Sequence, residues 1–151
     1  MEVTAAIEHY CRYQERCHKE VRNKLYELGC KTPEVEEHIA ELIEKDLLNE
    51  ERYARAIARG KFRMLQWGKI KIVQQLKFQQ ISEYCIKKGL SEIDEDEYQQ
   101  TAKELAAKKS RELRGEKKQY ILKQKIYRYL YGKGYEPNII NVAINEIIND
   151  D

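Results

Sequence analysis

Four arginines spaced along one segment are the residues best suited to bind another molecule. Arg52, Arg55, Arg59 and Arg63 recur every three or four positions, and at about 100° per residue of a helix they fall within one arc of roughly 80°. A planar guanidinium group can grip a carboxylate or a phosphate with paired hydrogen bonds. The sequence has no Asp or Glu between Arg52 and Ser82, so no nearby residue in the sequence offsets the positive charge of these arginines. We therefore expect these arginines to bind an anionic partner. The alternative is that they form a solvent-exposed helix face without a partner, as most runs of charged residues do.

Basic residues form two separate blocks, although the formal net charge is only +2. Residues 52–82 hold eight Lys and Arg and no acid, and residues 103–133 hold eleven against three acids, with an acidic run at 94–97 between the blocks. Two basic blocks predict a polyanionic or acid-faced partner that is touched at two places. The candidate partner- or DNA-binding residues are Arg52, Arg55, Arg59, Arg63, Lys69, Lys71, Lys77, Lys117, Lys118, Lys123, Lys125 and Arg128.

In the second basic block, tyrosines alternate with bases over residues 117–131. Aromatic rings can stack on the bases of a single strand while cations hold its phosphates. The alternative is that Leu122, Ile126 and Leu130 form a core stripe that the tyrosines flank. We favour the core interpretation for the apolar stripe, and a surface role for Arg128 and the lysines.

No catalytic or cofactor-binding pattern accompanies these basic residues. The sequence contains no HExxH, no GxxxxGK[ST] and no Ser/His/Asp arrangement. His9, Cys11, Cys17 and His18 do not have the spacing of a zinc site. We therefore expect a protein without enzymatic activity, cofactor or metal.

The cysteines and the N-terminus indicate a cytoplasmic protein. No apolar run approaches the roughly 18 residues that a membrane span needs, and the first residues lack the order of a secretory signal. The four cysteines have no CxxC spacing, so we expect reduced thiols that act as small hydrophobic residues. They are Cys11, Cys17, Cys30 and Cys85.

The segments that carry these residues are predicted to be helices. Only 2 Pro and 7 Gly punctuate the 151 residues, too few for an all-β fold. Thr32, Pro33 and Glu34 are typical of a helix start, with Thr32 as the N-cap. Periodicity predicts leading helices at about residues 4–16, 50–65 and 95–114. On the second of these, we expect an apolar docking face led by Tyr53.

That docking face has defined members and defined exceptions. Besides Tyr53 it is predicted to comprise Ala56, Ile57, Gly60 and Met64. Phe62, Leu65 and Trp67 lie off it; we expect Trp67 to be buried against the next unit, and exposure as an interface anchor is the alternative.

An internal repeat organises the helices. Six apolar positions recur in three copies, with offsets of 51 and 54 residues. The helix-end position is glycine in the outer copies but Gln80 in the middle one, which predicts a different helix end there. The matched sets are Val21, Ile72 and Ile126; Leu25, Leu76 and Leu130; Cys30, Ile81 and Tyr135; Val35, Ile86 and Ile140; Ile39, Leu90 and Ile144; and Leu42, Ile93 and Ile147.

The repeat predicts an all-α fold of tandem three-helix units. We place the units at residues 1–48, 49–93 and 94–151. Because each unit can bury only a thin core against its neighbours, we expect an elongated, curved array.

Three segments resemble the RecX regulatory proteins, which modulate the RecA recombinase. Residues 47–56 read LLNEERYARA, similar to that family's LLDDERFAxA signature, and residues 68–83 resemble its GxxxIxxxLxxxGIS segment. Residues 133–135 read KGY, where the third repeat of the family has RGF. The departures are Asn49, Tyr53, Gln80, Lys133 and Tyr135, none of which removes a catalytic group.

The resemblance implies a non-enzymatic regulator of homologous recombination that binds in the groove of a RecA–DNA filament. It also implies inhibition of ATP hydrolysis, strand exchange and coprotease activity by RecA. Apart from the resemblance, the basic faces allow weak, non-specific contact with DNA, and a monomer is the simplest expectation for the oligomeric state. A RecA-independent DNA-binding helical module is the alternative. A helical scaffold for an acidic protein fits the charge pattern as well.

Overall fold

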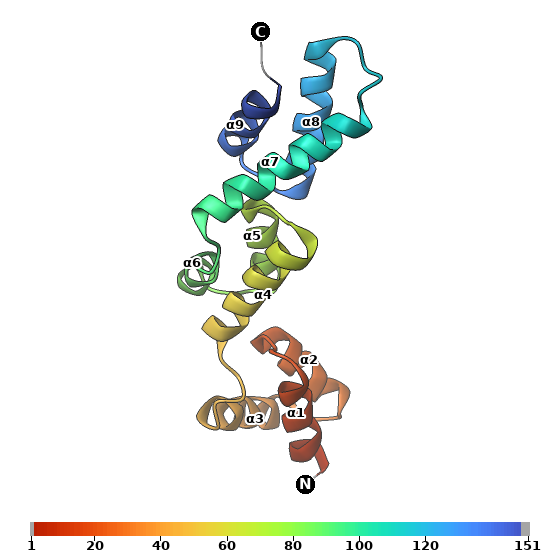
Figure 1. The fold of residues 1–151 in the computed structure, drawn as a ribbon. Coiled ribbons are helices and arrows are strands. Elements are labelled where there is room, and N and C mark those ends of the chain that lie inside the picture. The colour runs from red at the N-terminus through yellow and green to blue at the C-terminus, as the bar shows by residue number, and fades with distance from the viewer. Residues whose placement is uncertain (1, 149–151) are drawn as a thin grey trace. The chain divides into compact units, whose positions relative to one another are not determined.

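The computed structural model describes residues 2–148, and within that range the chain forms nine α-helices and no strand (Figure 1). All-α architecture is therefore confirmed. The helices fall into three successive groups of three, in agreement with the repeat found in the sequence. They are α1 (Glu2–Tyr13), α2 (His18–Glu27), α3 (Thr32–Glu44), α4 (Glu50–Leu65), α5 (Lys69–Phe78), α6 (Glu83–Leu90), α7 (Glu95–Glu112), α8 (Gln119–Lys133) and α9 (Pro137–Ile147).

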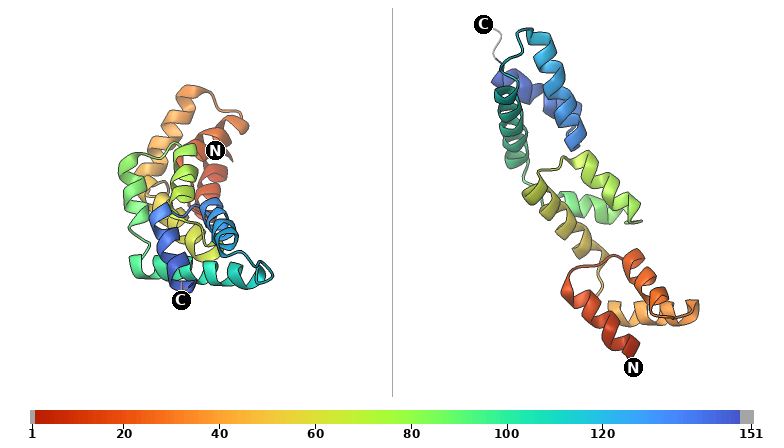
Figure 2. Two further views of the ribbon diagram at one scale, coloured as in Figure 1. Left: turned by 90° about the horizontal axis from the view of Figure 1, so that it is seen from above. Right: turned by 90° about the vertical axis from the view of Figure 1, so that its right-hand side faces the viewer.

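Contacts between residues divide the chain into two compact units. The first unit comprises Met1–Ile57 and Gln75–Leu90, and the second comprises Ala58–Gln74 and Ser91–Asp151. Helices α4 and α5 each contribute residues to both units. The second unit contains the packed group α7, α8 and α9, which Figure 2 shows side by side.

The apolar stripes of the repeat form the cores of the two units. Val21, Leu25 and Val35 are fully buried in the first unit, and Ile126, Leu130 and Ile140 are fully buried in the second. Of the eighteen matched repeat positions, only Leu90 and Ile147 are half-buried rather than buried. The spacing of apolar residues therefore identified the core positions correctly.

Local capping explains where several helices begin. Helix α3 starts at Thr32, one residue earlier than predicted, so the cap is Lys31 rather than Thr32. The Lys31 backbone N–H donates to the Glu34 carboxylate at 2.9 Å. The Cys17 backbone N–H donates in the same way to Glu20 before α2, also at 2.9 Å. In each case a glutamate in the first turn satisfies a backbone donor ahead of the helix.

The middle helix end was predicted wrongly. Gln80 adopts the left-handed conformation, with φ of 62°, as do Gly29 and Gly134 at the equivalent positions. The next residue, Ile81, donates its N–H to the Leu76 carbonyl at 3.0 Å, and Cys30 and Tyr135 make the same bond at 3.1 Å. All three helices therefore end alike, and Gln80 adopts a backbone conformation that favours glycine.

We expect Gln80→Gly to stabilise the protein by about 0.5–1 kcal/mol, because glycine relieves the steric cost of a left-handed residue. The reciprocal change, Gly29→Gln, should destabilise it by a similar amount, since Gly29 has a φ of 95°. Urea-unfolding midpoints measure both effects. A loss of stability on Gln80→Gly would contradict this account of the helix end.

The face by which α4 packs also differs from the prediction. Tyr53 is buried as expected, but its buried partners on the helix are Ala54, Ala58 and Phe62. Met64, assigned to the docking face, is 83% exposed. The small residues Ala54 and Ala58 carry little hydrophobic signal, which is why the face was misplaced by part of a turn.

A buried aromatic group holds the second unit together. The Tyr98 ring stacks on Tyr135 with centroids 5.1 Å apart and lies 5.8 Å from Phe62. The Tyr98 hydroxyl donates to the Glu136 carboxylate and accepts the Lys69 backbone N–H, the latter at 2.8 Å. One tyrosine thereby ties the start of α5 and the start of α9 to α7.

Candidate partner-binding site

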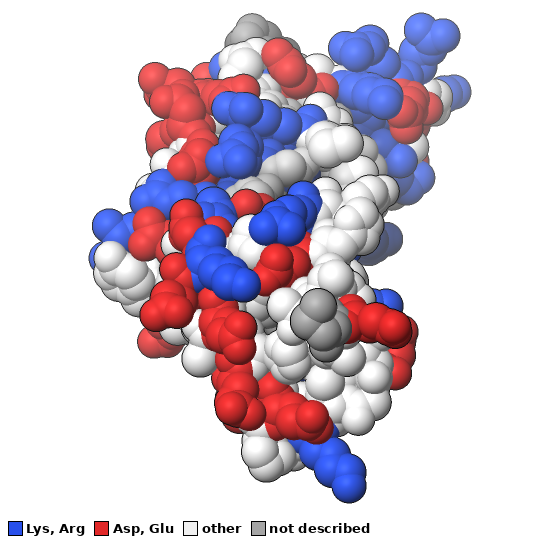
Figure 3. All heavy atoms as spheres, turned by 90° about the horizontal axis from the view of Figure 1, so that it is seen from below, with Lys and Arg blue, Asp and Glu red and all other residues white. Residues whose placement is uncertain are grey.

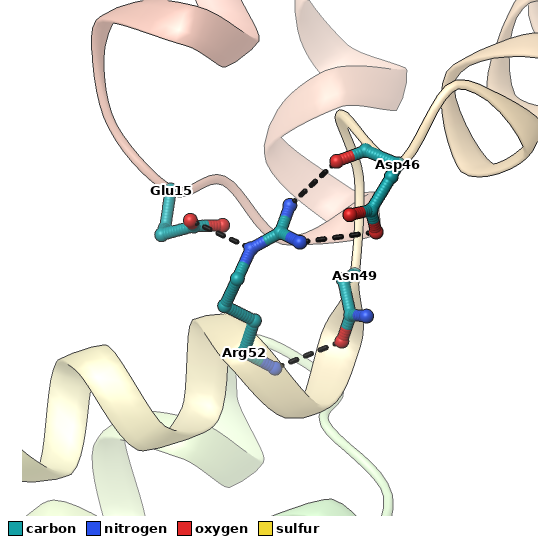
Figure 4. Close-up of polar contacts among 4 residues, drawn as sticks. All are labelled: Glu15, Asp46, Asn49 and Arg52. Carbon is teal, nitrogen blue, oxygen red and sulfur yellow. Dashed lines mark hydrogen bonds and ion pairs between the residues drawn. The ribbon is translucent and has the colours of Figure 1, made fainter.

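Arg52 lies at the start of α4 and is engaged by its own chain. Its Nε donates to Glu15 at 2.7 Å, and its two Nη atoms donate to the Asp46 carboxylate at 3.1 Å and to the Asp46 carbonyl at 2.9 Å (Figure 4). Asn49 caps the helix by accepting the Arg52 backbone N–H at 2.9 Å. This guanidinium group therefore fixes three segments of the first unit.

Two further arginines of the row also meet carboxylates. Arg55 Nε lies 3.0 Å from Glu51, one turn earlier, and Arg59 Nη1 lies 3.0 Å from Glu92. We had expected that no acid would offset the positive charge of these four arginines. That expectation was wrong, because Glu15, Asp46 and Glu92 approach them from other segments. Such half-exposed pairs contribute at most about 1 kcal/mol each, so an anionic partner can exchange with them at low cost.

Arg63 differs from the other three arginines. It is exposed, and no carboxylate between residues 2 and 148 pairs with it. Met64 and Leu65 beside it are also exposed, the former almost fully. The C-terminal end of α4 thus presents a charged group next to apolar surface, a combination frequent at protein interfaces.

The three predicted lysines of α5 have different surroundings. Lys69 pairs with Glu95 at 2.9 Å and lies over the Tyr98 ring, and its ammonium group holds the pKa of Glu95 below the ordinary value. Lys71 lies over the Trp67 ring, 4.7 Å from its centroid. Lys77 is exposed, and the described part of the chain supplies it with no ion pair.

The second basic block lies around the start of α8. Lys125 pairs with Glu116 at 3.2 Å, and Lys123 lines a shallow hollow of about 320 Å³ with Tyr120 and Tyr127. Lys117, Lys118 and Arg128 are exposed. No carboxylate in the described range pairs with those last three side chains.

The apolar stripe of α8 is a core stripe, as favoured. Ile126 and Leu130 are fully buried, and Leu122 is half-buried. Tyr120 and Tyr131 remain exposed.

On the face drawn in Figure 3, Lys and Arg lie interspersed with Asp and Glu rather than in one uninterrupted basic patch.

A group of cations that the sequence did not single out lies in the second unit. Two of its lysines, Lys61 and Lys71, lie over the ring of Trp67. Trp67 is half-buried, whereas the sequence predicted that it would be buried. We call this group the lysine–tryptophan cluster, and its members are Lys61, Trp67, Lys71, Lys108 and Lys133. Of these, only Lys71 was a predicted site residue. The signal that could have found the cluster was the pair of lysines flanking the single tryptophan.

Other kinds of site find no support among the described residues. No group of three or more His, Cys, Asp or Glu side chains between residues 2 and 148 is arranged to hold a metal ion. Across the same residues, no helix combines the length and the apolar character needed to cross a bilayer. Cys11, Cys17, Cys30 and Cys85 are buried free thiols, as predicted, and burial raises the pKa of Cys11, Cys17 and Cys85.

Comparison with protein families gives two matches. A family model described as the second three-helix domain of RecX matches residues 49–90. A model described as the third three-helix domain of RecX matches residues 95–144. The two models together cover more than half of the chain.

Curated relatives carry the name Regulatory protein RecX. A protein of Clostridium perfringens is 34% identical over 134 residues, which cover 88% of this chain and 62% of the relative. A protein of Lactococcus lactis is 30% identical over 141 residues, covering 92% of this chain and 52% of the relative. The chain thus spans between about half and three fifths of the length of these relatives.

Solved structures show the same fold. The crystal structure of RecX from Lactobacillus salivarius superposes with a TM-score of 0.88 at 26% identity, covering 97% of this chain and 94% of that one. A second crystal structure, of regulatory protein RecX, superposes with a TM-score of 0.83 at 25% identity and covers 99% of this chain.

Proposed function

Because the chain belongs to the RecX family of regulatory proteins, we propose that it binds the RecA nucleoprotein filament and inhibits ATP hydrolysis, strand exchange and coprotease activity by RecA. The observation that carries the proposal is the match of two consecutive RecX domains, at residues 49–90 and 95–144. The proposal places the chain in the cytoplasm, as a monomer that makes weak, non-specific contact with DNA.

The proposal assigns no chemistry to this chain. It assigns binding to the basic residues of α4, α5 and α8, with ATP turnover altered at the active site of RecA. Arg63, Lys77 and Arg128 support this role because they are exposed and have no carboxylate partner within residues 2–148. Arg55 and Arg59 would exchange their surface ion pairs for carboxylates of the partner.

The direct test is a titration of RecA, assembled on single-stranded DNA, with this protein while ATP hydrolysis is followed. Hydrolysis should fall and reach a lower plateau as the filament saturates. Unchanged hydrolysis at saturation, on a filament shown to be intact, would remove the proposed mechanism. A gel shift without RecA addresses the alternative: tight, sequence-selective duplex binding would favour a RecA-independent DNA-binding module.

We expect the double variant Arg55→Glu, Arg59→Glu to inhibit RecA at least about tenfold less potently, because each reversal replaces an attraction at the interface by a repulsion. The matched control is Lys31→Glu, Lys87→Glu, which makes the same charge change at two exposed lysines outside the proposed site. Circular dichroism verifies that helix content is retained. Equal potency of the two double variants would show that this face of α4 does not contribute to the inhibition of RecA.

A further inference from the structure

The lysine–tryptophan cluster is an accumulation of positive charge that the chain does not neutralise. The Lys61 and Lys71 ammonium groups lie over the Trp67 ring, 5.0 Å and 4.7 Å from its centroid. None of Lys61, Lys71, Lys108 and Lys133 pairs with a carboxylate of the described residues. In this respect the cluster is the opposite of Arg52, Arg59 and Lys69, each of which has an acidic partner.

The charges within the cluster act on one another. Burial lowers the pKa of Lys133, and the neighbouring ammonium groups of Lys71 and Lys108 lower it further. Like charges in one place raise the free energy of the folded protein unless an anion relieves them. The cluster therefore has electrostatic properties that favour the binding of an anion.

The backbone holds the cluster in a fixed geometry. Gln66 takes a left-handed conformation, with φ of 58°, in the turn between α4 and α5. Its carbonyl accepts the Tyr135 hydroxyl at 2.9 Å, and the Leu65 carbonyl accepts Lys133 Nζ at 2.8 Å. Gly68 N–H donates to the Lys133 carbonyl at 2.8 Å. Contacts with α8 thus hold the turn that carries Trp67 in place, so this turn loses little conformational entropy when a ligand binds.

We propose that the lysine–tryptophan cluster binds single-stranded nucleic acid, with one base stacked on Trp67 and its phosphates held by Lys61, Lys71 and Lys133. Any base can stack on an indole ring, and flexible lysines can swing from the ring face to phosphate oxygens. A duplex fits less well because its base faces are already covered. The inference rests on the proposed function in one respect, because it gives the expected DNA contact a defined site. The test contains no RecA, so its failure would be distinguishable from a failure to inhibit RecA.

The single tryptophan of the chain makes the test specific to this site. Oligothymidylate of about 15 nucleotides should quench Trp67 fluorescence to saturation. With three or four phosphates contacted, the logarithm of the binding constant should fall with the logarithm of salt concentration with a slope of about −2 to −3. Unchanged fluorescence across the titration would overturn the proposal.

Two further polyanions separate base stacking from charge alone. Inorganic polyphosphate presents phosphates without bases, and polyglutamate presents the carboxylates of an acidic protein. Both should bind more weakly than oligothymidylate at matched charge and leave most of the Trp67 emission unquenched. If polyglutamate binds as tightly as oligothymidylate, the cluster is a protein-docking surface and the proposal fails.

Variants assign the effect to individual side chains, with the anisotropy of a labelled oligothymidylate as the second readout. Trp67→Ala should weaken binding about tenfold through lost stacking, whereas Trp67→Phe should retain most of the affinity. Lys61→Gln, Lys71→Gln should weaken binding about tenfold and reduce the salt slope, while Lys31→Gln, Lys87→Gln should change neither. Equal losses for both lysine pairs would contradict a defined site.

Discussion

Replacing Gly68 by alanine is expected to destabilise the second compact unit by about 3–5 kcal/mol, the largest effect of any single substitution considered. A Cβ on Gly68 would lie 2.2 Å from the Gly134 carbonyl carbon, 2.3 Å from its oxygen and 2.4 Å from the Tyr135 nitrogen. All three are backbone atoms, so no side-chain rotation can relieve the clash.

Hydrogen bonds fix the backbones on both sides of this contact. Gly68 N–H donates to the Lys133 carbonyl at 2.8 Å, and Ile70 N–H donates to the Gly134 carbonyl at 2.9 Å. Moving α5 away from the end of α8 to admit a methyl group would break both bonds. The glycine and the KGY motif at 133–135 therefore serve one structural purpose, which is to join these two helices.

Gly60→Ala is the matched control for Gly68→Ala. Gly60 lies within α4, and a Cβ there would meet no atom within 4 Å. The same substitution should stabilise the protein by about 0.5–1 kcal/mol, because glycine in a helix is less favourable than alanine. Urea-unfolding midpoints should thus move in opposite directions. Similar shifts for the two variants would show that the helices are not in backbone contact.

Sequence periodicity predicted the helices well because it reports on burial along a single element. The predicted helix at 50–65 agrees with α4 at both ends, and the predicted helices at 4–16 and 95–114 differ from α1 and α7 by three residues or fewer at each end. Whether a helix forms, and where it ends, depends mainly on residues within a few positions in the sequence. The boundaries of the three repeats at 48 and 93, and the elongation of the array, stay predictions.

The binding site was harder to predict because its charges are set by contacts between distant segments. One of the two acids that engage Arg52, Glu15, lies 37 positions away, and the acid that engages Arg59 lies 33 positions away at Glu92. A row of arginines looks unneutralised in sequence when its partners are this remote. Conversely, Lys133 reaches the turn that carries Trp67 only through the fold, so no local pattern could single it out.

Raising the pH above 10 is expected to destabilise the protein by about 4 kcal/mol per pH unit through three tyrosines. Tyr53, Tyr98 and Tyr135 are almost completely buried, and burial raises the pKa of each phenol above the ordinary value of 10.0. For Tyr98, the hydrogen bond to the Glu136 carboxylate raises the pKa further.

The direction of this effect follows from the protons bound in each state. Above pH 10 the unfolded chain loses the three phenolic protons, whereas the folded chain keeps them. Each tyrosine therefore costs about 1.4 kcal/mol of stability per pH unit until the folded protein also ionises. The buried thiols of Cys11, Cys17 and Cys85 act in the same direction from about pH 9, because burial raises their pKa too. Lys133 opposes them, since its pKa is lowered in the folded protein.

Urea-unfolding midpoints at several pH values between 8 and about 11 measure the tyrosine contribution when wild type and Tyr98→Phe are compared. The variant should be less stable at neutral pH by about 1–3 kcal/mol, because the Lys69 N–H loses its acceptor and Glu136 its donor. Its loss of stability above pH 10 should nevertheless be shallower by about 1.4 kcal/mol per unit. Tyr13→Phe, at a position 75% exposed, should leave the pH dependence unchanged. Parallel curves for wild type and Tyr98→Phe would mean that this phenol ionises equally well in the folded and the unfolded chain, and that the aromatic group around Tyr98 admits water.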